Sequence, residues 1–258
     1  MTGKYKVTPE QTAFFNDQGY LLVKDIISAE EVLRYSGIYD KFLDGTIDAG
    51  KNRADLGIGM AKSGQVEAIT QIMWPSDFMP ALLEMSFHHR VLSISRDLLG
   101  KDMDFDFDML ISKAPGTNSP TPWHQDAAYW INMPDTRAVS CWMTLDDSTK
   151  ENGCMWYVPG SHKLPLRPHR FAGKVGGALM CDCSEEEGLA IEIKPGSCIF
   201  HHGHTLHYSR GNSTPGNRRA FIINLRPETM IALEREKGYD HGRGGNAADR
   251  QLRNQEIK

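Results

Sequence analysis

Hydrophobic and polar positions in the first hundred residues repeat at helical spacing. Thr8-Pro9-Glu10-Gln11 combines an N-cap hydroxyl, a proline at the first helical position and a glutamine that completes a capping box. Ser28-Ala29-Glu30-Glu31 repeats this pattern and predicts a longer helix, and a further helix is expected over 88–99. The short apolar run at 20–23 predicts a strand. We therefore expect residues 1–100 to be mostly helical.

The period changes at residue 103, where acidic and apolar residues begin to alternate. Residues 103–111 read Met-Asp-Phe-Asp-Phe-Asp-Met-Leu-Ile, which predicts a strand whose aspartates lie on a solvated face. Turns that contain glycine or proline separate further expected strands at 138–145, 154–158, 189–193, 197–201 and 219–225. Short strands that follow helices predict an α+β, mainly β fold. We expect a double-stranded β-helix (jelly roll) over 103–228, with the N-terminal helices packed outside.

Composition and charge narrow the class of partner. The chain has 258 residues, of which 40% are hydrophobic and 24% charged, as expected for one globular domain over 1–258. A net charge of −4 argues against nucleic acid or an anionic membrane surface as partner. The N-terminus lacks a signal-peptide pattern, and the five cysteines follow no paired framework, so we expect a cytoplasmic protein. Residues 234–258 are charged and glycine-rich, which indicates a polar tail or a lid.

The candidate chemistry begins in the stretch Trp123-His124-Gln125-Asp126. Side chains at i and i+2 of a strand leave the same face, so His124 and Asp126 would point into one space. Together they are two-thirds of the two-histidine, one-carboxylate set that holds Fe(II) and leaves the remaining positions open. A His-x-Asp tripeptide also occurs by chance, so further ligands have to come from elsewhere in the chain.

A third ligand is expected from the stretch 201–207, which contains four histidines. His207 differs from the others because Arg218 follows it by eleven residues, after a turn, on a predicted strand. A guanidinium brought back beside the metal could bind a carboxylate through two hydrogen bonds. Neighbouring strand residues point to opposite sides, so only one of Arg218 and Arg219 can face the interior, and we choose Arg218.

With these residues in place, the sequence resembles the phytanoyl-CoA dioxygenase family of iron(II)- and 2-oxoglutarate-dependent oxygenases. The resemblance spans roughly residues 10 to 228. It rests on the order and spacing of its motifs: Trp123-His-Gln-Asp126, Leu145-Asp-Asp, Glu151-Asn-Gly153, Pro159-Gly-Ser-His162 and Gly203-His-Thr-Leu-His207-Tyr-Ser209, followed by Arg218.

The resemblance implies a role for each residue that matches a family motif. It implies that His124, Asp126 and His207 are the iron ligands. It implies that Arg218 pairs with the distal carboxylate of 2-oxoglutarate and that Ser209 is its hydroxyl partner. Two further candidates for cofactor binding are Lys113, on the preceding strand, and Gln125, although Gln125 faces away from its neighbours on an ideal strand.

The implied reaction is hydroxylation of an unactivated C–H bond, with oxidative decarboxylation of 2-oxoglutarate to succinate and CO2. Related iron halogenases lack the ligand carboxylate and bind chloride in its place, so Asp126 implies hydroxylation rather than halogenation. The expected partners are a small-molecule substrate and O2, without nucleic acid or membrane, and the expected assembly is a monomer or a homodimer.

Candidate substrate residues lie near the metal motif and in two basic loops. Tyr129, Trp130 and Trp142 are expected to form pocket walls. The loop 161–187 contains His162 among several basic residues, and the early loop 44–67 adds Arg53. Such residues could receive a carboxylate or phosphate, so a small polar or anionic metabolite is the expected substrate, although a solvated loop surface is the simpler interpretation.

Two alternatives from other classes stay open at this point. A His/His/Asp set with open positions also suits Zn(II) and the activation of water, as in a zinc hydrolase. A jelly roll can instead be a non-catalytic binding module, in which the histidines are structural and the aromatic residues stack on a sugar.

Overall fold

The computed structural model describes residues 5–57, 66–172 and 178–243, and its centre is a pair of facing sheets. The larger sheet has seven antiparallel strands in the order β1-β11-β6-β13-β4-β3-β2. In chain order these strands are β1 (Tyr20–Val23), β2 (Arg53–Asp55), β3 (Ile69–Met73), β4 (Met103–Lys113), β6 (Val139–Thr144), β11 (Cys198–His202) and β13 (Arg218–Pro227).

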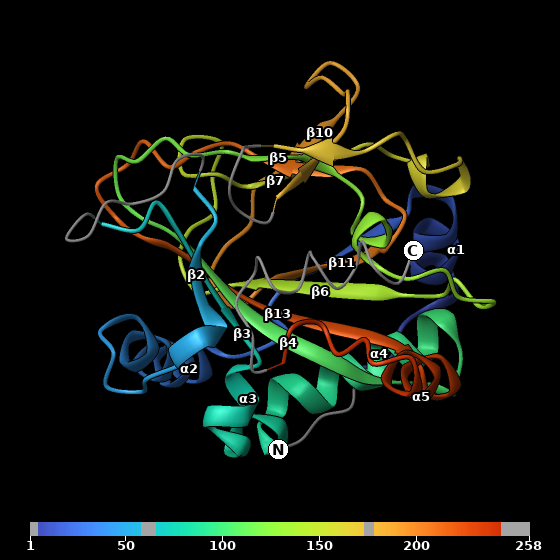
Figure 1. The fold of residues 1–258 in the computed structure, drawn as a ribbon, viewed down its shortest axis with the longest axis horizontal. Helices are drawn as coiled ribbons and strands as arrows, with labels where there is room; N and C mark the ends of the chain where they lie inside the picture. Colours follow the sequence, from blue (N-terminus) through green and yellow to red (C-terminus); the bar gives the residue numbers. More distant parts are fainter. Residues whose placement is uncertain (1–4, 58–65, 173–177, 244–258) are drawn as a thin grey trace.

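The smaller sheet lies over one face of the larger one (Figure 1). Its four strands, in the order β10-β7-β12-β5, are β5 (Thr121–His124), β7 (Met155–Tyr157), β10 (Leu189–Ile191) and β12 (His207–Ser209). A separate two-stranded ribbon pairs β8 (Arg170–Phe171) with β9 (Leu179–Met180). Two antiparallel sheets packed face to face form the expected jelly roll, so the predicted fold class is confirmed.

Helices cover the other face of the larger sheet (Figure 1). The α-helices are α1 (Pro9–Gln18), α2 (Ala29–Leu43), α3 (Pro75–Phe78), α4 (Ser86–Leu99) and α5 (Glu228–Glu236). Short 3-10 helices connect them to the sheets: η1 (Gly50–Asn52), η2 (Pro80–Glu84), η3 (Asp126–Tyr129) and η4 (Ser161–Lys163). None of the helices in the described part of the chain is long and apolar enough to cross a membrane.

Alternation along the central strand β13 shows how the layers are held together. Phe221 and Ile223 pack with the aromatic face of α2 in the core between the sheet and the helices. Ala220 and Ile222 point the other way, into the core between the two sheets. Each fully buried phenylalanine or isoleucine side chain contributes about 1.5–3 kcal/mol to stability. The strand is therefore apolar on both faces, and it leaves few positions where a polar side chain is tolerated without a partner.

The predicted helix starts depend on local chemistry and agree with the structure. Thr8 and Ser28 each accept a hydrogen bond from the backbone N–H three residues on, and Gln11 and Glu31 complete the two capping boxes. The expected helix over 88–99 begins two residues earlier, at Ser86, and ends before Gly100.

The N-terminal third contains more strand than the sequence predicts. Residues of β3 are all buried and pair with β4, and β2 extends this edge from inside the expected loop 44–67. Five residues of this pattern are too few for periodicity to separate a buried strand from a helix segment, and pairing with β4 decides between them. Part of that expected loop, 58–65, lies outside the described residues.

The aspartates of the strand 103–111 do not form the solvated face that their alternation predicts. Asp106 and Asp108 are 2% and 0% exposed. Asp108 accepts a hydrogen bond from Ser76 at 2.9 Å, because α3 and α4 cover this face of the strand. Asp106 sits at a β-bulge opposite the Asn224/Leu225 step of β13 and pairs with basic residues of the C-terminal segment. Buried carboxylates persist when such partners compensate them.

The segment from Glu234 to Arg243 is packed against the sheets rather than extended as a tail. Glu234 is fully buried, and Tyr239 and His241 are 1% and 2% exposed. The Tyr239 hydroxyl donates a 2.7 Å hydrogen bond to the carbonyl of Tyr129, which ties this segment to the turn after the metal motif. The rest of the expected tail or lid, 244–258, lies outside the described residues.

Candidate metal and cosubstrate site

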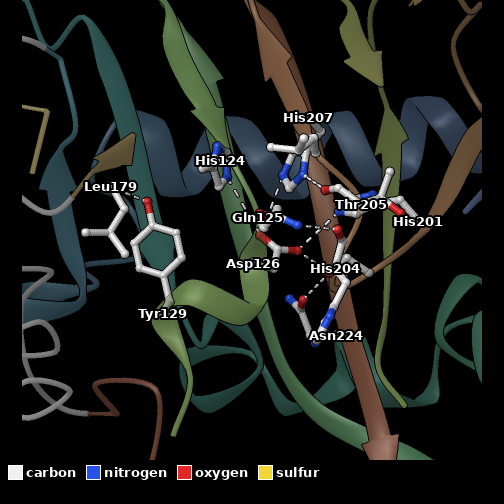
Figure 2. A network of polar contacts seen from close by, with 12 residues as sticks. His124, Gln125, Asp126, Tyr129, Leu179, His201, His204, Thr205, His207 and Asn224 are labelled. Atoms are coloured by element: carbon white, nitrogen blue, oxygen red, sulfur yellow. Dashed lines mark hydrogen bonds and ion pairs between the residues drawn. The ribbon is translucent and has the colours of Figure 1, made fainter. Parts of the chain in front are cut away.

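Two of the three candidate metal ligands lie on neighbouring strands of the smaller sheet, and the third follows one of these strands. His124 is the last residue of β5 and pairs across the ladder with His207, the first residue of β12. Asp126 is not in the strand but opens η3. The intervening Gln125 keeps an extended backbone (φ −122°, ψ 130°), so the alternation of the strand continues one residue past its end. Asp126 therefore still points to the same side as His124 (Figure 2).

The ligand atoms are close enough to share one cation. The Oδ1 atom of Asp126 lies 3.7 Å from Nε2 of His124 and 3.5 Å from Nε2 of His207. All three atoms lie within 4.8 Å of one another. Bonds from such ligands to a first-row metal are about 2.1 Å, so two ligand atoms can be separated by up to about 4.2 Å. Both separations from Oδ1 fall inside this limit, and the residues fit a metal ion.

Both imidazoles are arranged to present Nε2 to that ion. Nδ1 of His124 lies 2.7 Å from the carbonyl of Pro122, and Nδ1 of His207 lies 2.9 Å from the carbonyl of Thr205. A carbonyl can only accept, so Nδ1 carries the hydrogen in each ring and Nε2 keeps its lone pair. Burial lowers the pKa of both histidines, for His207 well below its usual value, and this favours the neutral, ligating form.

The carboxylate is held ionised by the surrounding imidazoles. Burial alone would raise the pKa of Asp126, but His207 and His201 outweigh it and hold the pKa well below its usual value. Asp126 can therefore ligate without losing a proton at neutral pH.

Arg218 provides a buried positive charge in the same cavity. It begins β13 on the side that faces the smaller sheet, and it is only 1% exposed. Its Nε and Nη1 atoms have no hydrogen-bond partner among the described residues, and its guanidinium carbon lies 5.2 Å from the centre of the Trp142 ring. Burial lowers the pKa of Arg218 to about 10, so the group is still charged at neutral pH. A buried, charged donor without a partner fits an anionic ligand.

Ser209 lines the same cavity as Arg218, whereas the other two candidate cofactor residues do not. Lys113 is fully buried opposite Arg218 on β4, but its Nζ donates to the carbonyl of Ser119 at 2.8 Å. Burial and the neighbouring Arg218 lower the pKa of Lys113 well below its usual value. The side chain of Gln125 is turned away from the ligands: it donates to the carbonyl of His204 at 2.7 Å and accepts from the backbone of Arg167 at 2.9 Å. It braces a loop.

Comparison with known proteins agrees with this geometry. The profile of the phytanoyl-CoA dioxygenase (PhyH) family matches residues 15–220, which is most of the chain. The chain belongs to the phytanoyl-CoA dioxygenase family. The expected family and enzyme class, a non-haem iron oxygenase dependent on 2-oxoglutarate, are therefore confirmed.

Individual known proteins are similar to this chain over most of their length. A probable phytanoyl-CoA dioxygenase of Caenorhabditis elegans is 29% identical over 90% of this chain and 79% of the relative. The structure of EvdO2 from Micromonospora carbonacea var. aurantiaca complexed with 2-oxoglutarate is 28% identical, with a TM-score of 0.71 over 87% of this chain and 93% of that one. The structure of EctD from S. alaskensis with 2-oxoglutarate and 5-hydroxyectoine is 25% identical, with a TM-score of 0.66 over 87% and 77%.

Three of the expected substrate residues line the cavity of this phytanoyl-CoA dioxygenase homologue. Trp142 lies beside Arg218, and Tyr129 and Trp130 form the wall at the end of η3. The Tyr129 hydroxyl also accepts a 2.7 Å hydrogen bond from the backbone of Leu179, so it links the metal motif to the ribbon of β8 and β9 (Figure 2).

The structure does not bring Arg53 or His162 into the cavity. Arg53 donates to the carbonyls of Phe42 and Leu43 at the end of α2 and pairs with Glu67 at 3.0 Å. The Nε2 atom of His162 lies 3.2 Å from the carbonyl of Asn16, where the ring packs against the turn after α1. Three basic residues in the described part of the loop 161–187 pair with acidic residues at the surface: Lys163 with Asp17, Arg167 with Glu187 and Arg170 with Asp182.

The cavity also contains polar residues that sequence reasoning missed. Gln71 on β3 and Asn224 on β13 are each 3% exposed, and Tyr239 and His241 close the cavity from the C-terminal segment. Gln71 interrupts the apolar run Ile-Thr-Gln-Ile-Met, and Asn224 interrupts Phe-Ile-Ile-Asn-Leu. A lone amide inside an apolar strand is the signal that could have revealed both, because such a group needs a partner when buried.

A second group of possible ligands, Asp106, Glu234 and His241, is better explained as an ion-pair network. Arg235 lies 2.5 Å from Asp106, and Arg226 is paired with Glu234. The Nε2 atom of His241 lies 2.9 Å from Asp106. Two guanidiniums already neutralise the two carboxylates, so a divalent cation would add uncompensated positive charge in a buried position.

Proposed function

We propose that this chain is an Fe(II)- and 2-oxoglutarate-dependent dioxygenase that hydroxylates an unactivated C–H bond of a small molecule, with release of succinate and CO2. The observation that carries the proposal is the combination of the ligand trio with a buried, unpartnered guanidinium in one cavity. A zinc hydrolase has no need for such an anion site. Family membership also favours the oxygenase over the hydrolase and over a non-catalytic binding module.

Each residue of the site has a distinct task. The neutral Nε2 atoms of His124 and His207 and the Oδ1 atom of Asp126 would hold the iron on one face, and the carboxylate would offset part of its charge. Iron and 2-oxoglutarate, when bound, supply the oxidation of the C–H bond by O2. Arg218 and Ser209 would hold the distal carboxylate of the cosubstrate, and burial of the guanidinium keeps water from competing for that carboxylate.

The proposal is tested by anaerobic titration of the purified protein with Fe(II) and 2-oxoglutarate. We expect a weak visible charge-transfer band that needs both components, and O2 consumption coupled one-to-one to succinate once substrate is present. A protein that binds Zn(II) but shows neither the band nor succinate formation would contradict the oxygenase assignment.

The substrate is proposed to be polar but uncharged where it meets the cavity wall. Apart from Arg218, the arginines and lysines expected to receive an anion are paired with acidic residues or carbonyls in the described part of the chain. The wall is mostly apolar, and it offers the unpartnered Oε1 of Gln71 and the cavity-facing end of the Asn224 carboxamide. Both groups suit hydrogen bonds to hydroxyl or amide groups.

Matched pairs of amides and carboxylic acids with the same carbon skeleton test this preference. They are scored by the succinate that each compound releases above the level without substrate. We expect the stronger stimulation from the amides, and a set in which only carboxylic acids stimulate would show that the substrate is anionic. A cytoplasmic location, and a monomeric or homodimeric state, stay proposals of the same kind.

A further inference from the structure

Three imidazoles surround the carboxylate of Asp126, but only two are arranged as metal ligands. The third belongs to His201 on β11, whose Nε2 lies 3.2 Å from Oδ2 of Asp126 (Figure 2). His201 is 3% exposed, and its ring centre lies 4.5 Å from that of His207. A third buried imidazole therefore contacts the carboxylate of Asp126 directly beside the candidate metal ligands.

The hydrogen-bond partners assign a different tautomer to His201 than to the two ligands. An ionised carboxylate only accepts, so Nε2 of His201 must carry the hydrogen that it donates to Asp126. In the neutral ring Nδ1 is then an acceptor, and the hydroxyl of Tyr157 lies 3.3 Å from it. His124 and His207 carry their hydrogens on Nδ1 instead. The Nε2 atom of His201 therefore has no lone pair to offer a metal.

The two carboxylate oxygens of Asp126 consequently have different roles. Oδ1 is the atom close to both ligand nitrogens. Oδ2 accepts from His201 and, at 2.8 Å, from the hydroxyl of Ser140. The hydroxyl of Ser140 has a single hydrogen. With that hydrogen on Oδ2, the carboxamide of Asn224 on β13, 2.6 Å from the hydroxyl, turns its N–H towards the hydroxyl oxygen. With two hydrogen bonds on Oδ2, only Oδ1 is free to bind the metal.

We propose that His201 is a positioning residue that keeps Asp126 a one-oxygen ligand, with Ser140 as its auxiliary. This proposal rests on the proposed iron function. A carboxylate released from these two donors can turn and bind through both oxygens, which would occupy a coordination position required for 2-oxoglutarate or O2. Partners of metal ligands commonly set metal affinity in this way, and their loss costs about 10- to 100-fold.

Matched substitutions on the same strand test the proposal. His201→Phe keeps the ring but removes the donor, whereas His201→Gln retains an N–H at the position of Nε2. His202→Phe is the control, because His202 is the next residue, faces away from Asp126 and lies against His162. Ser140→Ala removes the second donor with little change of volume. Thermal melting of the apo proteins verifies that each variant folds.

The primary readouts are the affinity for Co(II) and the absorption spectrum of the Co(II) protein, which responds to coordination number. The visible band with Fe(II) and 2-oxoglutarate is a second signature. We expect His201→Phe to weaken Co(II) binding 10- to 100-fold and to alter the Co(II) spectrum. His201→Gln should recover most of the wild-type affinity and most of the wild-type spectrum. Ser140→Ala should weaken binding about 3- to 10-fold, and His202→Phe should stay within threefold of wild type.

Several results would overturn the proposal. Unchanged affinity and spectrum in both His201→Phe and Ser140→Ala would show that these contacts are only structural. A His201→Gln variant no better than His201→Phe would exclude the donor role. If His201→Phe lost metal binding as completely as Asp126→Ala, His201 would itself be a metal ligand. Should His201→Phe fail to fold, Ser140→Ala and His201→Gln still test whether the hydrogen bonds to Oδ2 of Asp126 set the metal affinity. A wild-type protein without Fe(II) and 2-oxoglutarate binding would instead refute the proposed function.

Discussion

Replacing Arg218 with methionine should stabilise the apo protein and at the same time weaken 2-oxoglutarate binding. The guanidinium is buried without a hydrogen-bond partner for Nε and Nη1 in the described part of the chain, so the fold bears the cost of an uncompensated charge. Most core substitutions destabilise a protein, which makes the expected sign unusual. Opposite effects on stability and binding are expected only if the charge is retained for a ligand.

The expected change in the stability of Arg218→Met follows from the lowered pKa of Arg218 and from its contact with the Trp142 ring. Burial lowers the pKa of Arg218 from its ordinary 12.5 to about 10, which corresponds to about 3 kcal/mol of destabilisation at neutral pH. Loss of the contact with the Trp142 ring offsets about 1 kcal/mol of this. The net gain of about 2 kcal/mol raises the melting temperature by about 4–8 °C in a protein of this size. Loss of the buried charge pair should weaken 2-oxoglutarate binding by about 2–5 kcal/mol, or roughly 30-fold to several thousandfold.

Arg219 offers a matched control one residue away. Its side chain faces the helices and pairs at 2.7 Å with both Asp146 and Asp40. Arg219→Met should therefore lose about 1–2 kcal/mol of stability and leave the 2-oxoglutarate affinity within threefold. Thermal melting of the apo proteins and calorimetric titration of 2-oxoglutarate in the presence of Mn(II) measure the two quantities. The reasoning fails if Arg218→Met melts below wild type by as much as Arg219→Met, or binds 2-oxoglutarate normally.

Three further substitutions are expected to act through separate features. Asp126→Ala should abolish hydroxylation, and full turnover by this variant without added halide would contradict its assignment as a ligand. Gln71→Met should raise the apo melting temperature by about 2–4 °C, measured by calorimetry, because it removes a buried oxygen without a partner. Asp106→Asn should make the free energy of unfolding less dependent on pH in the acidic range. Burial alone would raise the pKa of Asp106, but His241 and Arg235 outweigh it and hold the pKa at about 2. Its contribution of about 2 kcal/mol is therefore complete above pH 4 and lost as the pH falls towards 2, as urea melts across that range would show.

Features that depend on neighbouring residues in the sequence were the most predictable. The capping boxes at Thr8 and Ser28 satisfy their own amides, so they define helix starts without tertiary information. Strand alternation placed Arg218 between the sheets and Arg219 outside, and it carried Asp126 to the side of His124 although Asp126 lies in η3 rather than in the strand. The two candidate ligands still point to the same side because the single residue between them is extended.

Features that depend on distant partners were not predictable from local pattern. The alternation of residues 103–111 indicated a solvated acidic face, yet Asp106 is neutralised by Arg235 and His241, which lie about half the chain away. The run that became β3 has no periodicity that separates a buried strand from a helix, and only its pairing with β4 decides. Basic loop residues such as Arg53 looked available for an anion because the sequence does not show Glu67 beside them.

The metal site and the walls of the cavity are built on different parts of the molecule, and this has a consequence for specificity. The two candidate histidine ligands and Arg218 begin or end strands of the two sheets, where ladder hydrogen bonds keep them in register, and Asp126 follows β5 after one extended residue. Besides Trp142 and Asn224 on the larger sheet, the walls come from three regions far apart in sequence: Leu56 and Gln71, Tyr129 and Trp130, and Tyr239 with His241. These segments are connected to one another mainly through side chains, as in the hydrogen bond from Tyr239 to Tyr129. We therefore expect substitutions in these walls to change which C–H bond is presented without disturbing the candidate ligands. Changes at His201 or Ser140, which line the cavity beside Asp126, should instead act on the metal site.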